Sequence, residues 1–239
     1  MTELVNKAYN FRKIELAILF SLKGVKELYG FDLSVPQNLD RYLINQTLFE
    51  LSRREIVTVA DKKAVINSEI DKILDGIAGA GSMLLFADQT GEYPEQCIYL
   101  GEEIVSVQMS ARSVDVVRIE GIEREQLPQR MIQMGLGIEQ VVTDDILFKD
   151  EELICPEIAE IAKHAFEKEK NQILEEEQVR ACLITISLLT RKKEALLLLI
   201  SKGVGDYIVV SNGTVDTVYA YSEKKLMQIV GNCIEGGDR

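Results

Sequence analysis

Apolar residues in the first part of the chain recur at the spacing of a helix face. In residues 11–22, Ile14 and Ile18 fall on the same side. Residues 39–53 follow a similar pattern and come directly after Asn38, a favourable N-cap residue. Both stretches are therefore predicted to be helices.

Two short strands are predicted next, at 56–59 and 64–66, because β-branched residues flank a charged turn. Helices followed by a hairpin are the order found in a winged helix, so residues 11–66 are predicted to form a winged-helix-like segment. Ser68 is expected to cap a further helix at 69–77.

From residue 83 the spacing of apolar residues shortens from the helical repeat to a repeat of two. Short connections rich in glycine and serine favour an antiparallel meander over parallel crossovers. The predicted sheet at 83–119 has strands at 83–87, 96–100, 104–110 and 114–119. A helix at 123–134 is expected to close this half.

The second half repeats that order. A long helix is predicted at 157–177, with Pro156 in its first turn, where a missing N–H costs nothing. The sheet at 180–221 is predicted to have strands at 180–190, 195–201, 207–211 and 214–221, with Asn212-Gly213 as a type I′ hairpin signal. A last helix is expected at 222–234.

Two short pieces of sequence recur in the same order. Residues 66–70 resemble 154–158, and both start a helix that precedes a sheet. Residues 114–117 resemble 215–218, and both form a last strand before a helix. We therefore predict an α+β protein of two pseudo-symmetric halves, each an antiparallel sheet of about four strands flanked by helices. The predicted division is 1–134 and 135–239.

The composition and net charge of the chain argue against some classes of partner. The 239 residues carry a net charge of −12, which opposes broad contact with nucleic-acid phosphates or anionic lipid. The apolar stretch 182–200 is interrupted by a charged turn, so two strands are predicted there and no membrane span. The four cysteines form no C-x-x-C pair, and no secretory signal is visible. We expect free thiols and a cytoplasmic location.

No catalytic, cofactor-binding or metal-binding residue is predicted, and we expect no enzyme activity. His164 is the single histidine and has no nucleophile context around it. Gly76, Gly79 and Gly81 run from helix to strand, which is the reverse of a phosphate-binding loop. The acidic run at 144–152 lacks the glycine of a calcium loop.

The winged-helix-like segment keeps an alternative function open, that of a transcriptional regulator with an α+β sensing domain. Between residues 40 and 63 of this segment, five basic residues outnumber four acidic ones by only one, although DNA-binding surfaces usually show a clear basic stripe. The basic residues are Arg41, Arg53, Arg54, Lys62 and Lys63, and the acidic ones are Asp40, Glu50, Glu55 and Asp61.

A protein partner is suggested by the strand pair at 183–190 and 195–200, which is apolar at nearly every position. Both faces of such strands need cover. The helix at 157–177 can cover one face, and we expect the other to meet the first half, a second copy of the chain, or an outside helix. The turn between the strands holds the densest basic cluster, so its residues are the predicted partner-binding site: Arg191, Lys192 and Lys193.

Taken together, the paired helix starts at 66–70 and 154–158 and the paired strands at 114–117 and 215–218 resemble the EspG-type chaperones of type VII secretion. The resemblance is one of architecture over nearly the whole chain. It implies a cytoplasmic adaptor that binds the tip of a helical secretion substrate, of the WXG or PE/PPE type, with no cofactor and no catalysis.

Overall fold

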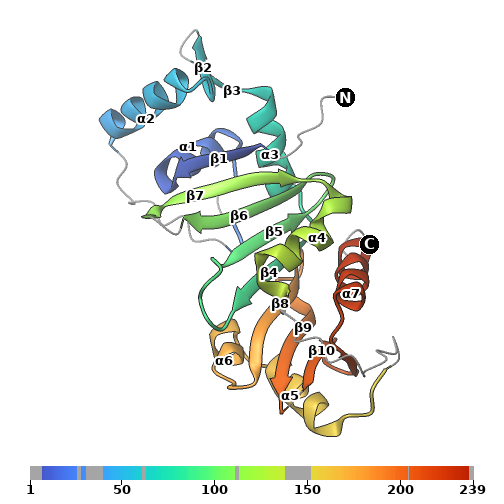
Figure 1. The fold of residues 1–239 in the computed structure, drawn as a ribbon. Helices are drawn as coiled ribbons and strands as arrows, with labels where there is room; N and C mark the ends of the chain where they lie inside the picture. Colours follow the sequence, from blue (N-terminus) through green and yellow to red (C-terminus); the bar gives the residue numbers. More distant parts are fainter. Residues whose placement is uncertain are drawn as a thin grey trace. The chain divides into compact units, whose positions relative to one another are not determined.

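The computed structural model describes residues 7–25, 28–30, 40–60, 63–110, 113–137, 152–203 and 205–236. Asn38, Asp61, Lys62 and most of the acidic run at 144–152 lie outside these ranges. The described part is an α+β protein, as predicted, and its sheet strands run antiparallel. It divides into two compact units. Figure 1 labels the helices and strands of both. Unit 1 contains 1–80 and 97–123, and unit 2 contains 81–96 and 124–239.

Unit 1 is a sheet flanked by helices and a separate hairpin. Its sheet has the order β1 (Ala8–Arg12), β7 (Ser113–Ile122), β6 (Ile104–Ser110) and β5 (Gln96–Leu100). Its helices are α1 (Lys13–Leu22), α2 (Arg41–Arg53) and α3 (Ser68–Ala78), and the hairpin pairs β2 (Val57–Ala60) with β3 (Lys63–Ile66). α3 contacts β6, and α1 contacts β1 and β7.

The helix starts in unit 1 differ from those predicted. The helix expected at 11–22 begins at Lys13, because Phe11 and Arg12 belong to a strand that pairs with β7. Asp40 caps α2 by accepting a hydrogen bond from the Leu43 N–H at 2.7 Å. Asn67, and not Ser68, caps α3, since its side chain accepts from the N–H two residues on.

The strands of unit 2 follow the order β4 (Ser82–Asp88), β8 (Val179–Ser187), β9 (Lys192–Lys202), β10 (Gly205–Ser211) and β11 (Asp216–Ala220). Its helices are α4 (Leu127–Met131), α5 (Pro156–Phe166), α6 (Lys170–Leu174) and α7 (Glu223–Gly236). A 3₁₀ turn (Arg124–Gln126) leads into α4, and a π-helical turn (Ile132–Leu136) follows it. The single helix expected at 123–134 is therefore three short segments.

Two local predictions in unit 2 are wrong. The long helix expected at 157–177 is broken into α5 and α6, because Glu169 takes an extended conformation and starts α6 with a capping box to Gln172. The β10–β11 turn is not type I′, since Gly213 has φ 82° but Asn212 does not have a positive φ. The Asn212 side chain instead accepts from the N–H of Val215 at 2.8 Å.

The expected division at residue 134 also differs from the two units. β4 pairs with β8 along its whole length, from Ser82–Ser187 to Asp88–Ala181, and α4 packs against α7. These contacts between parts distant in sequence place β4 and α4 in unit 2. A continuous boundary predicted from the order of elements could not include them.

The recurring pieces hold similar places in the order of elements along the chain. β7 and β11 are each the last strand of a run of four, and each precedes a helix. On its outer side β7 pairs with β1, which leads directly into α1. Leu153, two residues before Cys155 and the start of α5, makes an isolated antiparallel bridge to Val218 of β11.

Candidate partner-binding surfaces

The predicted basic cluster lies at the turn of the β8–β9 hairpin. We call Leu189, Arg191 and Lys192 the hairpin-turn surface, because all three are exposed there. Leu189 is 92% exposed, and Arg191 adopts a positive φ of 56°. An exposed leucine beside two basic side chains offers apolar contact and charge at one place, as partner-binding surfaces often do.

Lys193 has a different role from its two neighbours. Its Nζ donates hydrogen bonds to the carbonyl oxygens of Phe166 and Lys168, both at 2.8 Å, and lies 5.5 Å from the centroid of the Phe166 ring. These carbonyls belong to the C-terminal end of α5 and the break that follows, where backbone acceptors lack helical partners. Burial lowers the pKa of the Lys193 ammonium group. Lys193 therefore stabilises the fold of unit 2. Of the three predicted partner-binding residues, Arg191 and Lys192 remain on the exposed surface.

The apolar strand pair behind this turn is buried along most of its length, and α5 and α6 of unit 2 pack against it. α6 contacts β8 on the side of Cys182, whose thiol lies in the electrostatic field of Lys170. Thr185 points to the opposite face, where it forms a side-chain hydrogen bond with Cys233 of α7. We expected the first half, a second copy or an outside helix to cover that face. The hydrogen bond to Cys233 shows that α7, the C-terminal helix of the same half, reaches that face.

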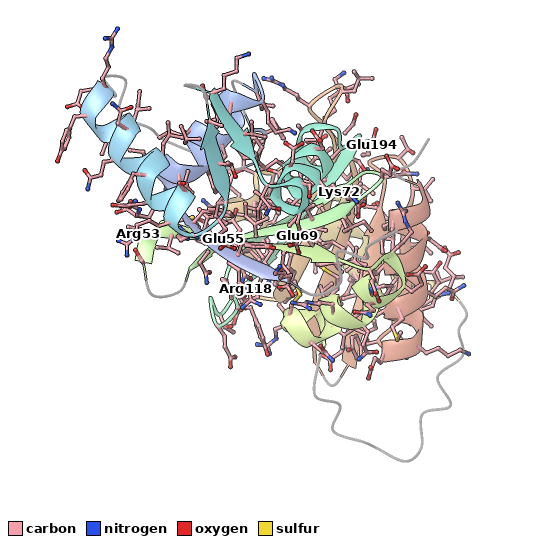
Figure 2. All side chains as sticks on the ribbon, turned by 90° about the horizontal axis from the view of Figure 1, so that it is seen from above. Arg53, Glu55, Glu69, Lys72, Arg118 and Glu194 are labelled. Carbon is pink, nitrogen blue, oxygen red and sulfur yellow. The ribbon has the colours of Figure 1, made fainter. Side chains whose placement is uncertain are left out.

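A second exposed surface lies on the outer face of α2. Tyr42 is 76% exposed and Phe49 is 65% exposed, and they share one helix face with Gln46 and Arg53 at spacings of four, seven and eleven residues. We call these four residues the α2 stripe. Figure 2 marks Arg53 near the end of this helix. Tyr, Phe and Arg are enriched in the cores of protein interfaces.

Sequence reasoning missed the α2 stripe because it considered only the buried side of this helix. The signal was present in the sequence, since Tyr42 and Phe49 are seven residues apart on the side opposite Leu51, which is fully buried. An amphipathic helix with two aromatic residues on its polar face is unusual and would have indicated an exposed patch.

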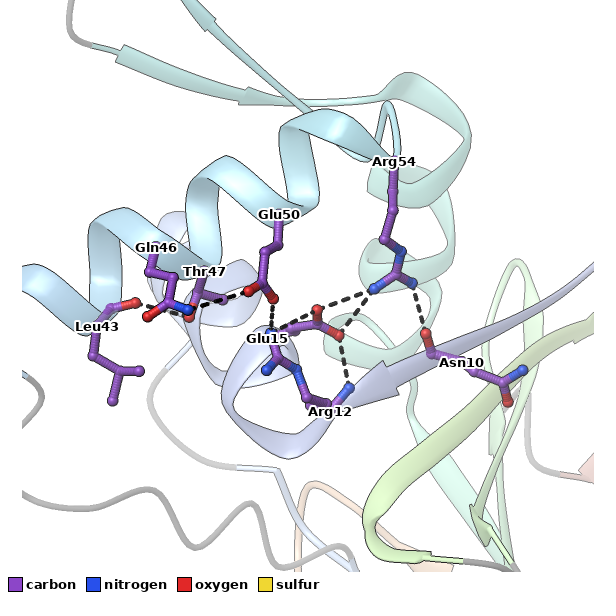
Figure 3. A network of polar contacts seen from close by, with 8 residues as sticks. All are labelled: Asn10, Arg12, Glu15, Leu43, Gln46, Thr47, Glu50 and Arg54. Carbon is purple, nitrogen blue, oxygen red and sulfur yellow. Dashed lines mark hydrogen bonds and ion pairs between the residues drawn. The ribbon is translucent and has the colours of Figure 1, made fainter.

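Among the described basic residues of the winged-helix-like segment, Arg54 makes contacts that the others do not. Arg54 turns back to the start of the chain, where its Nη1 lies 3.0 Å from Glu15 and its Nη2 donates to the Asn10 carbonyl oxygen at 2.7 Å (Figure 3). Arg12 pairs with Glu50 in the same network. Arg41, Arg53 and Lys63 are exposed. The loss of Arg54 to an internal ion pair weakens the DNA-binding interpretation.

The residues considered for catalysis are dispersed. His164 lies exposed on α5, and no disulfide joins any of the four cysteines, of which Cys97 and Cys182 are buried. Within the described ranges, no three His, Cys, Asp or Glu side chains are grouped to hold a metal ion. Gly76 serves close packing of α3, because a Cβ there would meet Glu103 and Val105 at 3.0 Å.

None of the helices in the described part of the chain has the length and apolar composition that crossing a membrane requires.

Comparisons with known proteins find solved structures of similar fold but no match by sequence. No protein-family model matches the chain, and no curated protein matches it. The chain is similar in structure to the Mycobacterium tuberculosis type VII secretion system chaperone EspG5, solved in complex with the PE25-PPE41 dimer. The TM-score is 0.58 at 10% sequence identity, and the match covers 98% of this chain and 97% of that one. The expected resemblance to the EspG-type fold is thus supported at the level of the fold.

Proposed function

We propose that this protein is a cytoplasmic chaperone or adaptor that binds a helical substrate of a type VII secretion system, of the WXG or PE/PPE type. The observation that carries the proposal is the end-to-end likeness to a secretion chaperone that was solved with its PE–PPE partner. Because the likeness covers 98% of the chain, it includes both units and not only a common sheet motif. The proposed role is binding, without catalysis or a cofactor.

Two surfaces have the composition that this role needs. The hairpin-turn surface combines Leu189 with Arg191 and Lys192 in a protein of net charge −12. It suits a helix whose end carries carboxylates beside an apolar residue. The α2 stripe presents Tyr42 and Phe49, large rigid side chains that act as anchors in many interfaces.

The alternative function, a DNA-binding regulator, has less support. Recognition would need the basic groups at the end of α2 to be available to phosphates, and the Arg54 guanidinium, although partly exposed, is engaged by the Glu15 carboxylate. A DNA-shift assay at moderate salt with genomic fragments is expected to show no specific complex. A sequence-selective complex abolished by Arg53→Ala would favour the regulator instead.

The proposal is tested by co-expressing the protein with small helical proteins encoded by neighbouring genes, followed by affinity capture and titration of the purified pair. We expect a stoichiometric complex with one neighbour. Leu189→Asp with Lys192→Glu tests the hairpin turn, and Tyr42→Ala with Phe49→Ala tests the α2 stripe. At least one double variant should weaken binding more than about tenfold, or about 1.4 kcal/mol, at an unchanged melting temperature.

Lys163→Glu is the matched control, because Lys163 is an exposed lysine on α5 outside both surfaces. It should leave the affinity unchanged. A stable complex that neither double variant weakens would show that both surfaces are misassigned while the chaperone role stands. Failure of every neighbour to bind would count against the role itself.

A further inference from the structure

A groove of about 440 Å³ lies in unit 1 beside strand β3. Its lining residues come from α1, β3 and α3, and they are Leu22, Lys23, Ala64, Val65, Ile66, Asp71 and Asp75. Three consecutive residues of β3 line it. Side chains of a strand alternate between its two faces, so a groove that touches three in a row follows the backbone edge of the strand.

The pairing register shows which backbone groups of β3 face this edge. Asn67 donates from its N–H to the Ile56 carbonyl oxygen at 2.9 Å, and the partners Val57–Ile66, Thr58–Val65 and Val59–Ala64 follow. Hydrogen-bonded and non-hydrogen-bonded pairs alternate along an antiparallel ladder. Ala64 and Ile66 therefore occupy non-hydrogen-bonded pairs, and their N–H and C=O groups point away from β2.

β2 is the single strand neighbour of β3 within the described part of the chain. No backbone partner for the outward groups of Ala64 and Ile66 occurs among the described residues. An edge strand with such groups is a template on which another strand can pair.

The side chains around the groove define the chemistry of an added strand. Val65 is 60% exposed and Leu22 is 43% exposed, and both offer apolar contact. On the opposite wall, the Lys23 ammonium group lies 2.5 Å from Asp71 and 2.7 Å from Asp75. Two partly exposed carboxylates share one ammonium group, so this wall keeps a net negative charge and favours a basic side chain.

We propose that the edge of β3 binds an extended segment of a partner protein as a third strand, with apolar residues against Leu22 and Val65 and a lysine or arginine beside Asp71 and Asp75. The backbone of the segment would exchange hydrogen bonds with Ala64 and Ile66. This site takes an extended peptide and uses none of the residues of the two surfaces assigned to a helical substrate. The proposal does not depend on the proposed chaperone function, and the two are tested by separate experiments.

The test uses a fluorescent peptide, Lys-Val-Lys-Val-Lys-Val-Lys, and measures its anisotropy on titration with the full chain. The expected result is saturable binding. A peptide with glutamate in place of lysine should bind at least about tenfold more weakly. A peptide of the same charge with N-methyl groups on alternate amides should also lose binding, because it cannot pair with a strand. This last peptide controls for general attraction to a protein of net charge −12.

Ala64→Pro tests the register directly. The proline removes an N–H that points outward and leaves the pairing with β2 intact, as proline on an edge strand does. We expect it to abolish peptide binding at an unchanged melting temperature, whereas Ala64→Val should retain binding. Asp75→Asn should weaken the basic peptide several-fold.

Equal binding of the plain and N-methylated peptides, or full binding by Ala64→Pro, would overturn the proposal. Strong protection of the Ala64 and Ile66 amides from hydrogen exchange in the free protein would also overturn it. Such protection would mean that the chain's own residues or a second copy already occupy the edge.

Discussion

Arg54 and Glu15 form an ion pair in which one nitrogen of Arg54, Nη1, contacts both carboxylate oxygens of Glu15, at 3.0 Å and 3.1 Å (Figure 3). The Glu15 side chain is only 3% exposed. The pair joins the end of α2 to the first turn of α1, and the Arg54 guanidinium also lies 5.4 Å from the centroid of the Phe11 ring. Arg54, which the sequence places in a basic surface cluster, thus links α1 and α2 within unit 1.

Arg54→Ala is expected to lower the free energy of unfolding by about 1–3 kcal/mol, because it leaves the Glu15 carboxylate buried with fewer charged partners. The lower part of that range is favoured, since the Arg54 side chain is itself partly exposed and screened by water. Urea unfolding of the full chain measures the change.

The neighbouring Arg53 supplies the control for this measurement. It is exposed, and no ion pair joins it to another described residue. Arg53→Ala should change the free energy of unfolding by no more than about 0.5 kcal/mol. Equal effects of the two substitutions would contradict the role assigned to Arg54.

Lys193→Met is expected to destabilise the protein by about 1–2 kcal/mol, because two carbonyl oxygens at the end of α5 lose their donor. Lys192→Met, at an exposed position next to it, should cost less than about 0.5 kcal/mol. A loss of stability from Lys192→Met as large as that from Lys193→Met would show that the turn as a whole, and not this contact, supports α5.

The lowered pKa of Lys193 also predicts a pH dependence. Between the folded pKa and the ordinary value of 10.5, the unfolded chain binds more protons at this lysine than the folded chain does. The stability of the wild type should therefore rise, relative to Lys193→Met, as pH increases through that interval. A constant difference between the two proteins up to pH 10.5 would contradict the assignment of the shift.

Gly135→Ala should lower the free energy of unfolding by about 1–3 kcal/mol. Gly135 has φ 114°, and a Cβ there would lie 2.6 Å from the Tyr93 ring and 3.0 Å from Phe86. Gly231→Ala is the matched control, because it lies in helix α7 with open space around its Cβ position. Alanine at residue 231 should be neutral or stabilise by up to about 1 kcal/mol. Similar destabilisation at both sites would mean that local strain at Gly135 is not the cause.

Thiol titration tests the state of the cysteines. Denatured protein without reductant should yield four thiols, since all four cysteines are free. Burial raises the pKa of Cys182 to about 12 and also raises that of Cys233. In the native protein at pH 8, Cys182 should thus react far more slowly than the half-buried Cys155. Two disulfides in the denatured sample, or equal rates for Cys182 and Cys155, would contradict this.

Many elements of the fold could be predicted from local patterns. The alternation of apolar residues located β5 at Gln96–Leu100 and β6 at Ile104–Ser110 with their observed bounds. The charged interruption after Thr190 correctly marked the β8–β9 hairpin. These features depend on neighbouring residues alone, because the period of side-chain burial and the chemistry of a turn are local properties.

The candidate partner-binding surfaces were less predictable, because the exposure of their charged residues depends on contacts between distant parts of the chain. Lys192 and Lys193 are adjacent and chemically identical, yet one lies exposed and the other binds carbonyls at the end of α5, about 25 residues earlier. Arg53 and Arg54 are also adjacent and chemically identical, yet Arg53 is exposed and Arg54 forms an ion pair with Glu15. No local pattern separates such pairs, since the partner of each charge is set by the packing of other elements.

By itself, the sequence determined the α+β class, the order of most strands and helices, and the recurrence of a last strand before a helix in both halves. Tertiary structure alone decided that β4 joins β8, that α7 reaches the second face of β8 at Thr185, and which lysine and arginine side chains bind other parts of the fold. The physical reason is that the period of side-chain burial in a helix or strand depends only on residues close in sequence. Strand pairing and ion pairing between segments depend on how the whole chain minimises exposed apolar surface and unpaired charge.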